Sequence, residues 1–191
     1  SDLVVFGKRA GAGAARYAVD VLGVPKVSDA EIESEIRDLL APLSRTSGET
    51  PYEVHQALQE CMGKNVGIFR VEEDLALALR ELEDLKERAA RVKVEGSRIY
   101  NPGWHLSRDL RNMLLVSEAI ARSALLRKES RGAHSRLDFT GMDASLGKVN
   151  MCVTRVPDGM KVAPTPLPEM PAELKALFDA APQPAPQRSG S

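Results

Sequence analysis

The chain has 191 residues, of which 43% are hydrophobic and 28% charged, and its formal net charge is −1. This composition is typical of a globular protein of one domain, or of one domain with a small appendage. The near-neutral charge argues against a nucleic-acid surface, which needs an excess of Lys and Arg. Aromatic residues make up only 4%, which favours helices over strands.

The sequence offers few candidates for metal or redox chemistry. Cys61 and Cys152 lie far apart and outside any C-x-x-C pattern, so we expect two buried or half-buried free thiols and no metal site. His55 and His105 stand at the starts of predicted helices, as capping or surface residues. No apolar run approaches the ~20 residues of a membrane helix. A start at "SDLVVFG", without Met, suggests a fragment of a longer protein.

The first predicted element is a helix over residues 1–22, with Ser1 or Asp2 as its N-cap. Three glycines within residues 7–13 each lower helix propensity by about 1 kcal/mol relative to alanine. Such glycines indicate close approach by another backbone or by a ligand. "GAGAAR" only faintly resembles a dinucleotide fingerprint, because it lacks the third glycine and no strand precedes it.

Two further helices follow, each with a recognisable start. One begins at Ser28 or Asp29 and is expected to end at Pro42. Thr50 caps the next, and Glu53 three residues later completes a capping-box pattern. The apolar stripe of this third helix comprises Val54, Leu58, Cys61 and Met62.

The next two predicted helices are the longest. One spans 71–94, and the other runs from Trp104 to Lys128. The inner stripe of the first comprises Leu75, Leu79, Leu82, Leu85, Ala89 and Val92. That of the second comprises Leu106, Leu110, Met113, Ser117, Ile120 and Ala124. Three such helices joined by short turns predict a rigid antiparallel bundle over about residues 50–128, with interaxial angles near +20°.

The character of the sequence changes after Asp138. Alternating stretches at 148–156 and 159–167, joined by "PDG", predict a short β-hairpin. The Pro-rich end contains a possible helix of one or two turns over 172–178 and is otherwise expected to be disordered. The predicted fold class is therefore mostly α: a helix, a three-helix antiparallel bundle, a β-hairpin and a disordered tail.

The segment "ESRGAHSRLDF", residues 129–139, concentrates charge directly after the last long helix. Cations near a helix C-terminus complement its unpaired carbonyls and its dipole. A glycine can turn the chain with a positive φ, and the two acids can pair with the two arginines. We expect a structural clasp, but the arginines and the histidine could instead contact a cofactor or substrate. The predicted clasp residues are Glu129, Arg131, Gly132, His134, Arg136 and Asp138.

Three stretches carry a family resemblance, in order over about residues 2–138: "DLVVFGKRAG", "LQECMGKNVGIFR" and "NPGWHLSRDLRNMLLVSEAIARSALLRKESRGAHSRLDF". They resemble the flavoprotein subunits of succinate dehydrogenase and fumarate reductase. The resemblance places the flavin fold, the histidine that carries covalent flavin and the groups that grip the dicarboxylate upstream, so no catalytic residue is assigned here. It also points the N-terminus of the first helix, at Ser1 and Asp2, toward the flavin. Asn150 and Val153 stand where family members often have Trp and His.

The resemblance implies a division into four parts. Residues 1–48 would be the end of the flavin-binding domain with a connecting helix, 49–130 the helical bundle domain, 131–170 the C-terminal motif and hairpin, and 171–191 a Pro-rich, largely disordered tail. The clasp would then lie between the helical and flavin domains.

The implied parent enzyme interconverts succinate and fumarate with FAD and passes electrons to an iron–sulfur subunit. Its partners would include that subunit and, indirectly, a membrane anchor on the cytoplasmic face, but no nucleic acid. The chain itself is expected to be an inactive scaffold that binds neither FAD nor metal. Two alternatives stay open. One is an L-aspartate oxidase, although "RGAHSR" fits the dehydrogenase branch better. The other is a freestanding helical interaction module, although the first helix is apolar and Gly-rich.

Overall fold

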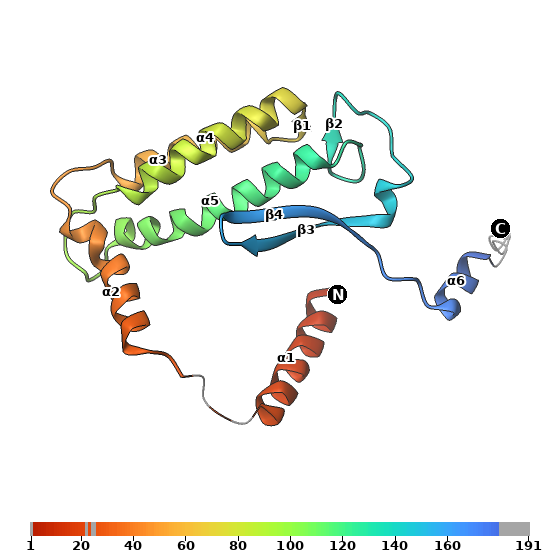
Figure 1. The fold of residues 1–191 in the computed structure, drawn as a ribbon, viewed down its shortest axis with the longest axis horizontal. Coiled ribbons are helices and arrows are strands. Elements are labelled where there is room, and N and C mark those ends of the chain that lie inside the picture. The colour runs from red at the N-terminus through yellow and green to blue at the C-terminus, as the bar shows by residue number, and fades with distance from the viewer. Residues whose placement is uncertain (1, 22, 24–25, 180–191) are drawn as a thin grey trace, which may run out of the picture. The chain divides into compact units, whose positions relative to one another are not determined.

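The computed structural model describes residues 2–21, 23 and 26–179. These residues are mostly helical (Figure 1). Contacts divide the chain into two compact units, Ser1–Ala41 and Pro42–Ser191. Ser1 lies outside the described residues, as does the stretch 180–191 of the predicted disordered tail.

Two helices begin the chain. The first, α1, spans Asp2–Asp20, and none of its described residues is buried by the rest of the described chain. The second, α2, spans Asp29–Ser44 and starts with a capping box: the Glu31 carboxylate accepts from the Ser28 backbone at 2.9 Å and from its hydroxyl at 2.8 Å.

The prediction that α2 ends at Pro42 was wrong, because the helix continues to Ser44 with the proline inside it. Near a helix end, proline removes only one intrahelical hydrogen bond. Pro42 is also buried, and its carbonyl accepts from the Val94 backbone at 2.9 Å. This contact gives a partner to a carbonyl in the last turn of α2, which has no intrahelical donor.

The bundle consists of α3 (Pro51–Asn65), α4 (Glu72–Ala90) and α5 (Pro102–Leu126). The predicted capping box is confirmed at the start of α3, where the Glu53 backbone donates to the Thr50 hydroxyl at 3.3 Å. Figure 1 shows the three helices side by side. The fully or nearly fully buried apolar side chains that they share include Val54, Leu58, Cys61, Leu75, Ala78, Leu82, Leu85, Leu110, Leu114, Ala121 and Ala124.

Two details of the predicted stripes were wrong. The helix expected over 71–94 ends at Ala90, and residues 92–94 follow outside the helix, with their two valines still buried. This segment is held because Lys93 donates its backbone N–H to the Glu49 carbonyl at 2.9 Å. In α5, Ile120 was expected inside but is 43% exposed. The buried face instead passes through Leu114 and Ala121, because steps of three and four residues from Leu110 arrive there.

A buried ion pair joins α4 to α5. The Glu118 carboxylate accepts from Lys86 and from Arg122, each at 2.6 Å. Burial alone would raise the pKa of Glu118, but its two cationic partners outweigh that effect and lower it. The carboxylate therefore stays ionised within the packed helix interface.

Two small sheets complete the described structure. The predicted hairpin is confirmed as β3 (Val149–Val156) and β4 (Gly159–Pro166), in which Val156 pairs with Gly159 at the turn and Gly159 has a φ of +123°. The short helix η1 (Leu146–Lys148) precedes it, and the predicted terminal helix is present as α6 (Ala172–Asp179).

The second sheet was not predicted. It is a parallel pair of two-residue strands, β1 (Phe69–Arg70) and β2 (Ser135–Arg136). Strands this short leave no periodic signal in a sequence. Within the described ranges, no helix combines the length and the hydropathy of a bilayer-spanning segment.

Candidate functional site

The segment after α5 folds back and places Arg136 against the end of that helix. The Arg136 side chain is 1% exposed and donates to the carbonyl oxygens of Ala124 at 2.9 Å and of Leu125 and Arg127 at 3.4 Å. These carbonyls belong to the last turn, which has no further intrahelical donors. The guanidinium therefore closes the helix and places positive charge at the negative end of its dipole.

Asp138 connects this helix end to the start of α4. Its carboxylate accepts two hydrogen bonds of 2.7 Å from Arg136 and one of 2.8 Å from the Glu72 backbone N–H. The residue at the N-cap position of α4 is Val71, which has no side-chain capping bond, so a residue far along the chain does the capping. The bonds from Arg136, and then the one from Glu72, lower the pKa of Asp138 to about 2.

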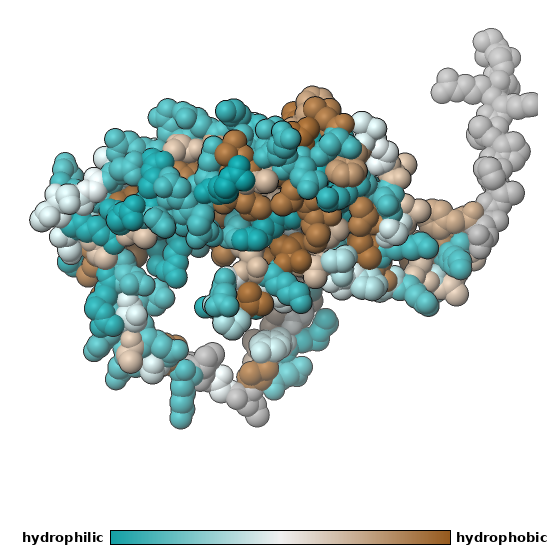
Figure 2. All heavy atoms as spheres, turned by 45° about the horizontal axis from the view of Figure 1, so that its top comes forward, coloured by the Kyte–Doolittle hydropathy of each residue, from teal (hydrophilic) through white to brown (hydrophobic). Residues whose placement is uncertain are grey.

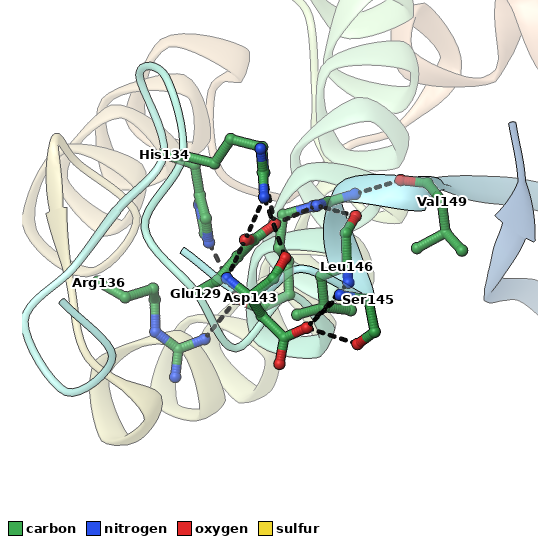
Figure 3. Close-up of polar contacts among 9 residues, drawn as sticks. Glu129, His134, Arg136, Asp143, Ser145, Leu146 and Val149 are labelled. Atoms are coloured by element: carbon green, nitrogen blue, oxygen red, sulfur yellow. Dashed lines mark hydrogen bonds and ion pairs between the residues drawn. The ribbon is translucent and has the colours of Figure 1, made fainter. Parts of the chain in front are cut away.

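Glu129 is the second acidic centre of the segment and is fully buried. Its carboxylate pairs with Arg127, accepts two bonds of 3.0 Å from Arg131, and accepts the Asp143 backbone N–H at 2.7 Å (Figure 3). The bonds from Arg131 are the largest cause that lowers the pKa of Glu129 to about 2, and they outweigh the cost of burial. The carboxylate is therefore charged at neutral pH and fully engaged.

His134 lies between two arginines and uses both ring nitrogens. Its Nε2 lies 3.0 Å from the Arg127 carbonyl oxygen, and its Nδ1 lies 2.9 Å from Arg70 Nη1. A carbonyl only accepts, so we assign the proton to Nε2, which leaves Nδ1 to accept from Arg70. Burial lowers the pKa of His134, and the neighbouring arginine charges lower it further. A neutral ring with both nitrogens occupied is poorly suited to acid–base chemistry.

The turn that brings these side chains together depends on Gly132. Its φ is +58°, which confirms the predicted turn at this glycine. The backbones of Arg131 and His134 pair across this turn with hydrogen bonds of 2.9 and 3.0 Å. Arg131 and His134 therefore leave the turn on the same side of the chain as the end of α5.

All six residues of the predicted clasp belong to this one region, and the two predicted acid–arginine pairs are present. The participants that were missed include Arg70, Glu72, Arg127, Ser130 and Asp143. Arg70 and Glu72 lie more than sixty residues before their partners, so only the tertiary fold brings them together. Asp2, in contrast, is the exposed first residue of α1 in the other compact unit.

The two cysteine thiols lie outside the clasp and differ in burial. Cys61 is buried, and burial is the main cause that raises the pKa of its thiol to about 12. Cys152 is exposed, so the expectation that both thiols are at least half-buried was wrong. It lies on β3 in a hairpin whose residues are mostly exposed. Across the described residues, no group of three or more His, Cys, Asp or Glu could hold a metal ion.

The turn between β1 and α4 does not fit the phosphates of a dinucleotide. Such a cofactor uses a glycine-rich turn between a strand and a helix N-terminus with free N–H groups. The strand β1 leads into α4, but the first turn of α4 carries Glu72, Glu73 and Asp74, and Asp138 already occupies the Glu72 N–H. Negative charge would repel a pyrophosphate there.

Comparison with known proteins gives the same family along most of the chain. The family described as "Fumarate reductase flavoprotein C-term" matches residues 55–175. The fumarate reductase flavoprotein subunit of Haemophilus influenzae is 33% identical over 148 residues, which are 75% of this chain and 24% of that protein. The corresponding Mycobacterium tuberculosis subunit is 34% identical over 165 residues, 83% of this chain and 28% of that protein.

Solved structures agree. Mycobacterium smegmatis Sdh1 in complex with UQ1 superposes with a TM-score of 0.85 at 43% identity, over 93% of this chain and 31% of that one. The Escherichia coli quinol fumarate reductase with a FrdA E245Q mutation gives a TM-score of 0.74 at 29% identity, over 88% of this chain and 30% of that one. The chain spans about a quarter of the length of the curated relatives it matches. It belongs to the succinate dehydrogenase and fumarate reductase flavoprotein family of oxidoreductases, as the C-terminal helical domain.

Proposed function

We propose that this chain is the supporting C-terminal part of an FAD-dependent subunit that interconverts succinate and fumarate. The match of residues 55–175 to the C-terminal family is the observation that carries the proposal. The chain itself is a scaffold, and the groups that bind the flavin and the dicarboxylate belong to the remainder of the subunit.

The clasp gives the scaffold its physical role. Arg136, Asp138 and Glu129 connect the end of α5, the start of α4 and the chain that leads to the hairpin through short charged hydrogen bonds. Because α4 and α5 are fixed to each other at this end, the surface that they form should keep its geometry when another domain packs against it. The clasp residues, within Glu129 to Asp138, would act by positioning α4 and α5 and would not contact the reacting atoms.

The cofactor is expected to be held elsewhere in the subunit. The acidic first turn of α4 opposes phosphate binding, as described above. Among the described residues we assign Asp2, the first residue of α1, to the flavin neighbourhood; Ser1, the other residue expected there, lies outside the described residues. In the complete subunit, bound FAD would supply the acceptor for the hydride removed from succinate.

Electrons would leave through an iron–sulfur subunit, and the complex would attach to the cytoplasmic face of a membrane through a separate anchor. Two solved relatives bear quinones in their descriptions, which supports a role in a quinone-linked complex: one is Mycobacterium smegmatis Sdh1 in complex with UQ1, and another is a quinol–fumarate reductase with menaquinol molecules.

The complete subunit provides the test of the activity. We expect dye-coupled oxidation of succinate and no peroxide formation with L-aspartate. Aspartate oxidation that produces peroxide would assign the chain to the L-aspartate oxidases instead.

The scaffold role has its own test. Purified 1–191 incubated with FAD should keep no stoichiometric flavin absorbance after desalting. In the complete subunit, Arg136→Gln or Arg131→Gln should reduce flavin retention, whereas Arg155→Gln on the exposed hairpin should not. Flavin bound to 1–191, or normal retention in both clasp variants, would contradict the scaffold role.

A further inference from the structure

The two-residue strands of the β1–β2 pair have chemically different faces. The pair is parallel, with Phe69 opposite Ser135 and Arg70 opposite Arg136, and the Leu137 N–H donates to the Arg70 carbonyl at 2.9 Å. Side chains alternate between faces along an extended chain. The arginines therefore occupy the face that enters the clasp, and Phe69, Ser135 and Leu137 share the opposite face.

This opposite face is apolar and uncovered by the described residues. On this face Phe69 is 66% exposed and Leu137 59%, and Ile68, in the bend immediately before β1, is 73% exposed. Figure 2 shows hydrophobic residues gathered at the end of the molecule where β1 and β2 lie. A two-stranded sheet that faces water normally places its charged side chains outward. Here the order is reversed, which indicates a covered surface in the assembled protein.

The backbone that presents this face is held rigidly. Arg70 Nε donates to the Gly67 carbonyl at 2.8 Å and to the Val66 carbonyl at 3.3 Å, while its other end reaches His134. Gly67 approaches α3 so closely that an added Cβ would lie 2.7 Å from the Gly63 carbonyl oxygen. A preorganised apolar surface loses little conformational entropy when a partner covers it.

We propose that Ile68, Phe69 and Leu137 form the docking surface of the helical domain for the flavin-binding part of the same subunit. This inference rests on the proposed function, because it assigns a place to the remainder of a flavoprotein. The chain matches only 24% of the Haemophilus influenzae subunit and 31% of Mycobacterium smegmatis Sdh1, so most of such a polypeptide lies outside it.

The size of the surface favours an occupant on the same polypeptide over a separate subunit. Three side chains provide far less than the roughly 800 Å² per partner of a standard interface between separate proteins. A tethered domain needs less area, because the linkage gives it an effective concentration on the order of millimolar. Arg70 and Arg136, on the other face of the two strands, would then fix the position of the docking surface relative to the end of α5 and the start of α4.

Thiol labelling can test the proposal without relying on activity. Ser135→Cys places a nearly isosteric probe between Phe69 and Leu137 on the same face and keeps all three apolar side chains. Ile99→Cys, in the exposed loop before α5, is the matched control. Both are made in a Cys152→Ser background, and labelling of each peptide by a maleimide is followed by mass spectrometry in three preparations: 1–191, the complete subunit, and the subunit with its iron–sulfur partner.

We expect position 135 to react at least tenfold more slowly in the complete subunit than in 1–191, with no further change when the iron–sulfur subunit is added. Position 99 should react at the same rate in 1–191 and in the complete subunit. Equal rates for position 135 in all three preparations would overturn the proposal. Protection that appears only with the iron–sulfur subunit would overturn it as well and would assign the surface to that partner.

A second variant keeps the result interpretable. Phe69→Ser should leave the unfolding free energy of 1–191 nearly unchanged, since the ring is exposed there, but should raise labelling of position 135 in the complete subunit. If Phe69→Ser leaves position 135 protected, the apolar face is not what docks. Succinate oxidation measured on the same complete subunit separates the two proposals, because an active subunit with an unprotected position 135 contradicts the docking surface alone.

Discussion

Replacement of Arg136 by Met should be among the most destabilising single changes in the chain. The substitution keeps an unbranched apolar stem in a site that is 1% exposed, so it removes the guanidinium and leaves little cavity. It deletes two bonds of 2.7 Å to Asp138 and one of 2.9 Å to the Ala124 carbonyl, and it leaves both acceptors without their main partner. It also removes the cation that lies 4.8 Å from the centre of the Phe139 ring.

The magnitude follows from what is left unpaired. Removal of one member of a buried ion pair typically costs about 3–5 kcal/mol. The Asp138 side chain is 27% exposed and can recover part of its hydration, which places Arg136→Met near the lower end, at about 3 kcal/mol. Arg136→Lys keeps the charge but cannot form the two-pronged contact, so we expect a smaller loss of about 1–2 kcal/mol.

Urea unfolding of 1–191, followed by circular dichroism at 222 nm, measures these losses directly. Arg155→Met on the exposed hairpin is the control, with an expected change within about 0.5 kcal/mol. A domain of this size has a total stability of about 5–15 kcal/mol, so a loss of 3 kcal/mol is readily resolved. If Arg136→Met unfolds within 1 kcal/mol of Arg155→Met, the helix ends do not depend on this guanidinium, and the clasp is wrongly described.

Three further predictions concern other contacts. The pKa of Asp138 is lowered to about 2, so its contribution to the free energy of unfolding should be fully present above about pH 4.5 and be lost as the pH falls toward 2. Asp138→Asn should flatten that part of the pH–stability curve, and an unchanged slope would contradict the assignment. Gly48→Ala should destabilise the protein strongly, because φ is +139° and the new Cβ would lie 2.3 Å from the Arg91 carbonyl oxygen. Gly63→Ala, in the open face of α3, should instead stabilise it by about 0.5–1 kcal/mol, and thermal melts that rank the two variants the other way would refute this. Finally, Glu118→Ala should lower the melting temperature, because it leaves Lys86 without its buried carboxylate partner. The double variant Glu118→Leu with Lys86→Met should recover most of the loss. A double variant as unstable as Glu118→Ala would show that packing and not charge is responsible.

The sequence predicted those parts of the fold that depend on local chemistry. The capping box at Thr50 and Glu53, the glycine turns at 132 and 159, and the bundle stripes all follow from residues within a few positions of one another. The errors lie where a distant contact prevails over the local pattern. The α2 helix continues past Pro42, whose carbonyl accepts from Val94, and the segment after α4 leaves the helical pattern where Lys93 donates to Glu49 in the connection before α3.

Within the clasp, only the contacts between residues close in sequence were predicted. The pairs Glu129–Arg131 and Arg136–Asp138 are two residues apart and could be anticipated from charge alone. The contacts of Arg70 with His134 and of Asp138 with Glu72 span 64 and 66 residues, and nothing local marks them. The proposed activity rests on the family match, because among the described residues no group of three or more His, Cys, Asp or Glu could hold a metal ion and the first turn of α4 is acidic.

The shared use of Asp138 has a dynamic consequence. One carboxylate holds both the guanidinium that closes α5 and the backbone N–H that opens α4. Fraying at either terminus must release this same anion, so the two ends should open as a single cooperative event and not as independent local fluctuations. Amide protons in the first turn of α4 and the last turn of α5 would then exchange with solvent at matched opening free energies, although the two turns lie more than fifty residues apart in the sequence.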